Sequence, residues 1–164
     1  MLRTLISSDI NILNKLNKTY PFIPNEDSIR PTPVLMKQKK ISIDYISTYW
    51  NSMRDYINHN VFDVKAKINR DGLMYSDDKS VKEWVFKEAQ FPYNINNGKH
   101  RILWKYSNTM ADYDISNNVH TINKIIETKL YLILKHDNFN FVWYPNPKPS
   151  IPDFFHVQVF WHEL

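Results

Sequence analysis

Residues 139–161, FNFVWYPNPKPSIPDFFHVQVFW, contain two apolar segments that flank a proline-rich loop. The first segment, residues 139–145, is rich in aromatic side chains, which favour a strand. In the second segment, residues 154–161, alternate side chains are apolar and share one face of a strand: Phe155, Val157, Val159 and Trp161. We predict that the two strands pair as a long hairpin, through the eight-residue loop 146–153 with its three prolines.

The other face of the strand 154–161 carries His156 and Gln158, between Phe154 and Phe160. A histidine is suited to proton transfer, or to nucleophilic attack on phosphorus, near neutral pH. The Gln158 amide can hold a phosphoryl oxygen or a leaving group. The alternative is a structural histidine whose ring nitrogens bond backbone carbonyls or tyrosine hydroxyls. His156 is therefore the candidate catalytic residue, and both interpretations stay open.

A third strand and a long helix accompany this hairpin. Residues 100–106 alternate as a strand, with one face made of His100, Ile102, Trp104 and Tyr106. If this strand joins the same sheet, His100 and Trp104 lie near His156 and contribute to the same ligand site. Residues 119–135 are the clearest helix, with apolar side chains three and four residues apart that are expected to pack on the sheet: Val119, Ile122, Ile126, Leu130 and Ile133.

The N-terminal half is predicted to be mainly helical. Residues 5–18 and residues 41–60 show helical spacing of apolar side chains, and the four prolines within residues 20–35 predict an extended arm between them. Asp71-Gly72 marks a turn. Ser80 and Glu83 have the spacing of a capping box, which predicts a helix from Ser80 that Pro92 stops.

This order of elements predicts an α+β fold in a single domain of residues 1–164. A small, mostly antiparallel sheet has strands near 100–106, 139–145 and 154–161, and helices cover one face of it. The N-terminal region is helical, with residues 20–35 as a proline-rich arm. No internal repeat or linker interrupts the chain.

Composition excludes several classes of protein. The two glycines of this 164-residue chain cannot form a Walker A or a dinucleotide-binding glycine loop, and the chain has no cysteine for thiol catalysis or disulfides. The net charge is +4, but lysines cluster only in MKQKK at 36–40, so we expect no nucleic-acid surface. Without a signal peptide or a long apolar segment, the chain is expected to be cytoplasmic and free of membrane spans.

The loop before the last strand offers further polar groups. Asn146 and Ser150 can donate to a phosphate or a sugar hydroxyl, although the same residue types also suit a turn. His156 and His162 lie about 20 Å apart in a straight strand and cannot share one metal ion. We therefore predict no metal and no cofactor.

Two segments of the chain carry a family resemblance. FPYNINNGKHRILWKYS (91–107) and FVWYPNPKPSIPDFFHVQVFW (141–161) resemble an uncharacterised family that includes the fungal N-acetylglucosamine-induced proteins. The resemblance covers about residues 41–164. It is most specific at Phe91-Pro92-Tyr93, His100, Trp104, Trp143, Asn146, Ser150-Ile151-Pro152 and His156-Val157. It adds Trp143 to the expected ligand-binding residues.

One position departs from that family pattern. Phe154 stands where many of these relatives have the first histidine of a His-x-His motif, so a reaction here depends on His156 alone or is impaired. The ending FFHVQVF is also similar, more weakly, to the His-x-Gln ending of a branch of the histidine-triad superfamily. It lacks the first histidine, and the step from Ser150 to His156 is longer than in that pattern.

Two hypotheses about function follow. The first is a small enzyme acting on phosphoesters or nucleotide sugars, with His156 as nucleophile or general base and with oxygens held by Gln158, Asn146 and Ser150. The second is a non-catalytic domain whose aromatic, histidine-bearing cleft binds a small ligand or a partner protein. The expected ligand is a small phosphorylated or sugar compound.

Overall fold

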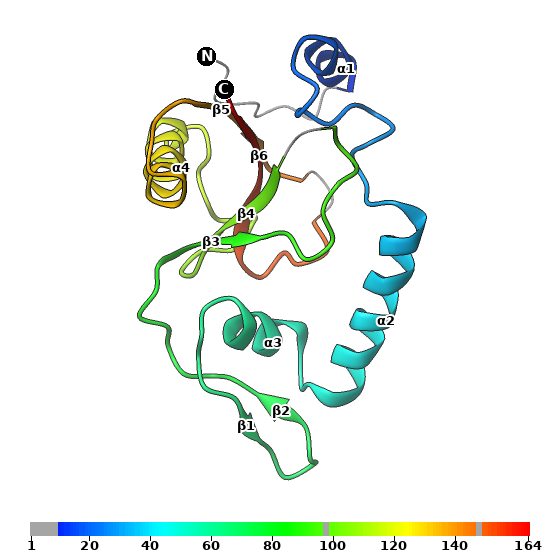
Figure 1. The fold of residues 1–164 in the computed structure, drawn as a ribbon. Coiled ribbons are helices and arrows are strands. Elements are labelled where there is room, and N and C mark those ends of the chain that lie inside the picture. Colours follow the sequence, from blue (N-terminus) through cyan, green and yellow to red (C-terminus); the bar gives the residue numbers. More distant parts are fainter. Residues whose placement is uncertain (1–9, 97–98, 147–148) are drawn as a thin grey trace.

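A four-stranded antiparallel sheet, in the order β3-β4-β6-β5, lies at the centre of the molecule (Figure 1). The computed structural model describes residues 10–96, 99–146 and 149–164. The strands are β3 (Trp84–Glu88), β4 (Lys99–Lys105), β5 (Phe139–Tyr144) and β6 (Phe155–Glu163). The α+β class and the three expected strands are confirmed, and β5 pairs antiparallel with β6 as predicted.

Helix α4 (Val119–Leu134) packs on one face of the sheet, as its spacing predicts. Its buried side chains, Ile122, Ile126 and Leu130, meet the alternating set of β6 in one apolar cluster. Each such side chain contributes roughly 1.5–3 kcal/mol when fully buried. The helix ends where Lys135 adopts the left-handed conformation, with φ of 64°.

The opposite face of the sheet is also covered, which goes beyond the expected single helical layer. Helix α1 (Ile10–Thr19) and the segment after it bury Leu13, Phe22 and Ile23 against β5 and β6. Helix α3 (Met53–Asn60) buries Ile57 in a cluster that includes Trp104 of β4. Residues 5–9 of the predicted first helix lie outside the described residues.

The predicted helix 41–60 is wrong, because the chain forms two helices there. Helix α2 (Pro33–Tyr49) ends at an extended Trp50, and α3 begins after Ser52, whose hydroxyl accepts from the Asp55 N–H. Trp50 forms a β-bridge to Met74, and the Asn51 N–H donates to the Met74 carbonyl at 2.8 Å. The contact with Met74 therefore ends the helix at Trp50, although the helical spacing of apolar residues continues past this position.

The segment that supplies Met74 is a short hairpin of β1 (Lys67–Ile68) and β2 (Met74–Tyr75). Its turn includes Gly72 at φ of 80°, a conformation that glycine adopts readily. The turn predicted at Asp71-Gly72 is confirmed.

The helix predicted from Ser80 is also wrong, because residues 84–88 form β3. Ser80 accepts from the Lys82 N–H and donates to the Phe62 carbonyl, so it does not cap a helix. Glu83 instead forms an ion pair with Lys105 of β4. Of the two residues that resemble a capping box, Glu83 thus contributes to the contact with β4, and Ser80 bonds the segment that contains Phe62.

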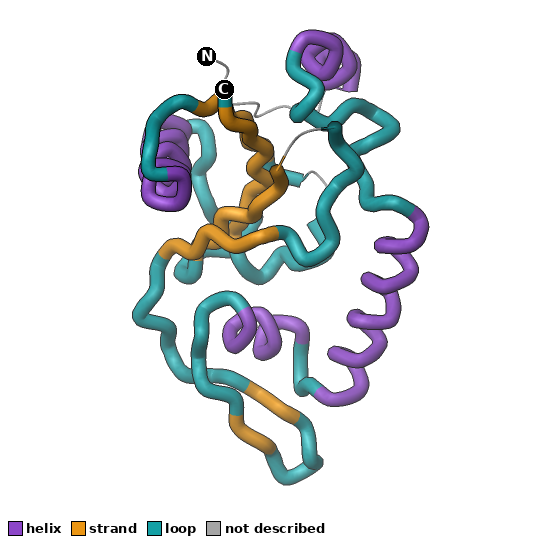
Figure 2. Tube along the Cα trace, viewed as in Figure 1, coloured by secondary structure: helices purple, strands orange, loops and turns teal. Residues whose placement is uncertain are grey.

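The proline-rich stretch is irregular over residues 20–32, and Figure 2 shows it as loop. Helix α2 begins at Pro33, which occupies the first turn, and the Thr32 side chain accepts from the Leu35 N–H. The predicted arm, 20–35, is therefore three residues too long at its C-terminal end. None of the helices in the described part of the chain is long and apolar enough to cross a membrane, and the cytoplasmic location stays a prediction.

Candidate functional site

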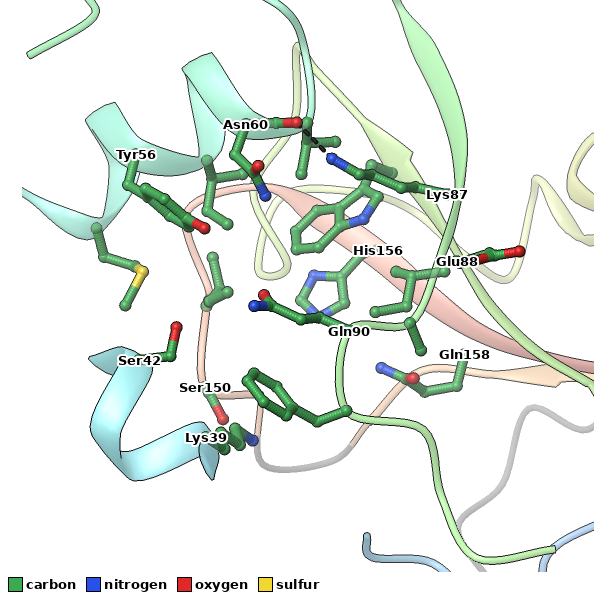
Figure 3. A pocket seen from close by; sticks show the side chains of 18 of the residues that line it. Lys39, Ser42, Tyr56, Asn60, Lys87, Glu88, Gln90, Ser150, His156 and Gln158 are labelled. Atoms are coloured by element: carbon green, nitrogen blue, oxygen red, sulfur yellow. Dashed lines mark hydrogen bonds between the residues drawn. The ribbon is translucent and has the colours of Figure 1, made fainter. Parts of the chain in front are cut away.

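A cavity of about 280 Å³ lies on the face of the sheet opposite α4 (Figure 3). β4 and β6 contribute lining residues from the sheet, α2 and α3 form another wall, and residues 87–93 and the loop before β6 complete it. This volume is close to that of small-molecule sites in proteins, and most of its wall is apolar.

The cavity brings together most of the residues singled out from the sequence. Lining it are His100, Trp104, Asn146, Ser150, His156 and Gln158. Trp143 does not line it, because its register opposite Val159 puts it on the α4 face of the sheet. There the Trp143 Nε1–H donates to Asn123 Oδ1 at 2.7 Å, so the expectation that Trp143 binds the ligand finds no support in this geometry.

His156 is held in a defined orientation within β6. Its ring stacks on Trp104, with the two ring centroids 4.5 Å apart. Its Nδ1 lies 2.9 Å from the Phe154 carbonyl oxygen. A carbonyl only accepts, so Nδ1 carries the hydrogen. Burial lowers the pKa of His156, which favours the neutral ring with an unprotonated Nε2.

That unprotonated Nε2 forms no hydrogen bond with any residue that the structure describes. The ring lies among the cavity-lining side chains in Figure 3. Trp104, which stacks on the ring, also lines the cavity, whereas Trp143, Phe154 and Phe160 are not part of its wall. His156 therefore lines the cavity with a neutral ring, and its Nε2 has no hydrogen-bond partner among the described residues.

His100 has both ring nitrogens engaged with the protein. Its Nε2–H donates to Gln158 Oε1 at 2.5 Å, and its Nδ1 accepts from the Tyr93 N–H at 3.1 Å. Burial lowers the pKa of His100 to about 4, in agreement with a neutral ring. His100 thus positions Gln158. With its carbonyl oxygen already bonded, Gln158 offers its NH2 group as a donor to the cavity.

Two lysines contribute to the wall and were not selected from the sequence. Lys87 donates to the Asn60 carbonyl at 2.6 Å. Lys39, on α2, has a pKa lowered by burial and by the nearby positive charge of Arg30. Lys39, Ser42, Ile43 and Ile46 recur with helical spacing, which is the signal in the sequence that could have identified this face of α2.

Acidic groups contribute little to the cavity. Glu88 is the one carboxylate among the described lining residues, and it pairs with Arg101 at 3.3 Å. Within the described residues, no group of three or more His, Cys, Asp or Glu side chains could hold a metal ion. The site therefore combines cations, neutral donors and a neutral histidine.

No protein-family model matches the chain, and a comparison with curated proteins finds no match either. Among solved structures, the chain is similar to one described as "Crystal Structure of HTC1". The TM-score is 0.50 at 13% identity, and the alignment covers 92% of this chain and 81% of the other. At this identity the similarity concerns the fold alone.

Proposed function

We propose that the cavity binds a small phosphorylated or sugar compound and that Nε2 of His156 acts on it as nucleophile or general base. The observation that carries this proposal is the His156–Phe154 hydrogen bond, which places the hydrogen on Nδ1. The lone pair on Nε2 is then available at the cavity wall without prior loss of a proton.

The two roles differ in the bond that Nε2 forms. As a nucleophile on a phosphoester, Nε2 bonds to phosphorus while the bond from phosphorus to the leaving oxygen breaks, and water then hydrolyses the phosphohistidine. As a general base, Nε2 takes a proton from the water or hydroxyl that attacks. In both cases the NH2 group of Gln158, two residues along the same face of β6, donates to a ligand oxygen.

The family resemblance adds support from the position of its motifs. Most of its specific residues line the same cavity, namely Phe91, Tyr93, His100, Trp104, Asn146, Ser150, Ile151 and His156. We take this as support for a site shared with the family that includes the fungal N-acetylglucosamine-induced proteins. Phe154, in place of a histidine, packs against Phe62 with ring centroids 5.0 Å apart, so the reaction proposed here uses one histidine.

The experiment is a thermal-shift screen with nucleotides, sugar phosphates and nucleotide sugars, followed by product analysis with each ligand that stabilises the protein. A ligand at 100 times its dissociation constant adds about 2.7 kcal/mol to the free energy of unfolding. We expect His156→Asn to abolish turnover, and His120→Asn, at an exposed position on α4, to retain it. Turnover by His156→Asn at the parent rate would rule out the reactive role.

One observation favours the second candidate function, a domain that binds its ligand without reaction. The Nδ1 of His156 bonds a backbone carbonyl and not a carboxylate, and Glu88 is already paired with Arg101. Among the described lining residues, no unpaired carboxyl group is therefore present to protonate a leaving group. Under this alternative a ligand stabilises the parent protein and remains chemically unchanged after long incubation.

A further inference from the structure

One lysine of helix α2, Lys39, lines the cavity, and the neighbouring lysines of the helix do not. Lys39 lines the cavity together with Ser42, Ile43 and Ile46, which follow it at the three- and four-residue spacing of one helix face. Lys37 and Lys40 are exposed and are not part of the wall. On the α2 side, the positive charge in the cavity wall therefore comes from Lys39 and not from a continuous basic surface.

The charge of Lys39 has no counter-ion in the described part of the protein. None of the ion pairs there involves Lys39, and Glu88 on the same wall is paired with Arg101. The nearby Arg30 adds positive charge, and both this charge and burial lower the Lys39 pKa. A partly buried ammonium group beside another cation is unfavourable unless an anion approaches it.

Neutral donors accompany this cation. Ser150 contributes a hydroxyl and Gln158 contributes the NH2 group that His100 orients. In Figure 3, α2 and the loop that carries Ser150 lie on one side of the cavity, and β6 with His156 forms its floor. An ammonium group, a hydroxyl and an amide around one space match the oxygens of a phosphate group.

We infer that the ligand of this cavity carries a phosphate group and that Lys39 neutralises its charge, which makes Lys39 the residue that selects phosphorylated over neutral sugars. This inference rests on the proposed function and narrows its ligand class. Lys39 acts here in recognition, and the reacting atom remains Nε2 of His156. Lys87 differs from Lys39 in that its ammonium group already donates to the Asn60 carbonyl.

The test compares the binding of inorganic phosphate, glucose 6-phosphate and glucose to the parent protein, Lys39→Gln and Lys40→Gln. Calorimetric titration at low and high salt gives each dissociation constant. Loss of one charge-assisted hydrogen bond weakens binding roughly tenfold to hundredfold. We expect this weakening for phosphate and glucose 6-phosphate in Lys39→Gln alone, with partial recovery in Lys39→Arg. We also expect the parent affinity to fall as salt rises.

Three results would each overturn the inference. The first is that Lys39→Gln and the parent protein bind inorganic phosphate and glucose 6-phosphate with equal affinity. The others are that the parent binds none of the probes, or that it binds glucose more tightly than glucose 6-phosphate. Melting curves of Lys39→Gln check that the variant is folded. His156→Asn separates the two proposals, because it removes turnover and leaves the Lys39-dependent difference between the two sugars in place. If turnover survives in His156→Asn while that difference is present, the proposed reaction fails and the phosphate site stands.

Discussion

His100 makes the stability of the fold sensitive to acid. Burial holds its pKa at about 4 in the folded protein, against 6.5 for the unperturbed side chain. Between these two pH values the unfolded chain binds more protons than the folded protein, so the free energy of unfolding decreases as the pH falls from 6.5 to 4. Each pKa unit corresponds to about 1.4 kcal/mol, so the His100 contribution lost over this range is about 3 kcal/mol, of which about 2 kcal/mol is lost by pH 5.

Urea unfolding at pH 7 and pH 5, followed by tryptophan fluorescence, measures this contribution. The parent protein is compared with His100→Gln, which cannot take up a proton, and with His120→Gln, at an exposed position on α4. We expect the loss of stability between the two pH values to be about 2 kcal/mol smaller in His100→Gln than in the other two proteins. His156, whose pKa burial also lowers, keeps some acid sensitivity in every variant. An equal loss in all three proteins would refute the assignment of His100 as a buried neutral histidine.

Two further predictions concern the helix that covers the other face. Ile126→Ala removes a fully buried side chain from the α4–sheet cluster and should destabilise the protein by about 2–5 kcal/mol. Leu132→Ala, at an exposed position on the same helix, should change the free energy of unfolding by less than about 0.5 kcal/mol. The urea titration described above measures both effects. Lys135→Gly should raise the melting temperature, because it relieves about 1–2 kcal/mol of strain at the left-handed end of α4, and an unchanged or lower melting temperature would contradict this.

Helices and strands whose apolar side chains recur with the period of the backbone could be predicted from the sequence. From Phe155 to Val159 of β6, apolar and polar side chains alternate, so Val157 and Val159 lie on one face and His156 and Gln158 lie on the other. Helix α4 has one apolar face over its whole length, and that face meets the sheet. In both elements the apolar side chains that face the core recur with the period of the backbone, so the local sequence contains the information, although both faces of β6 are buried.

The elements that were mispredicted depend on contacts between distant parts of the chain. The apolar pattern of residues 41–60 continues through Trp50, but the bridge from Trp50 to Met74 ends the helix there. Ser80 and Glu83 have the spacing of a helix cap, but the ion pair of Glu83 with Lys105 and the pairing of β3 with β4 favour a strand. Backbone pairing with a neighbouring strand outweighs a weak local propensity.

The candidate site divides in the same way. Alternation along each strand predicts that His156 shares a face with Gln158 and that His100 shares a face with Trp104. Both placements follow from the local sequence. Only the tertiary structure showed that Trp143 faces α4, that His100 orients Gln158, and that Lys39 reaches the cavity from α2. These facts depend on strand register and on the position of a helix relative to the sheet. Both are set by the packing of the whole chain, which no local repeat encodes.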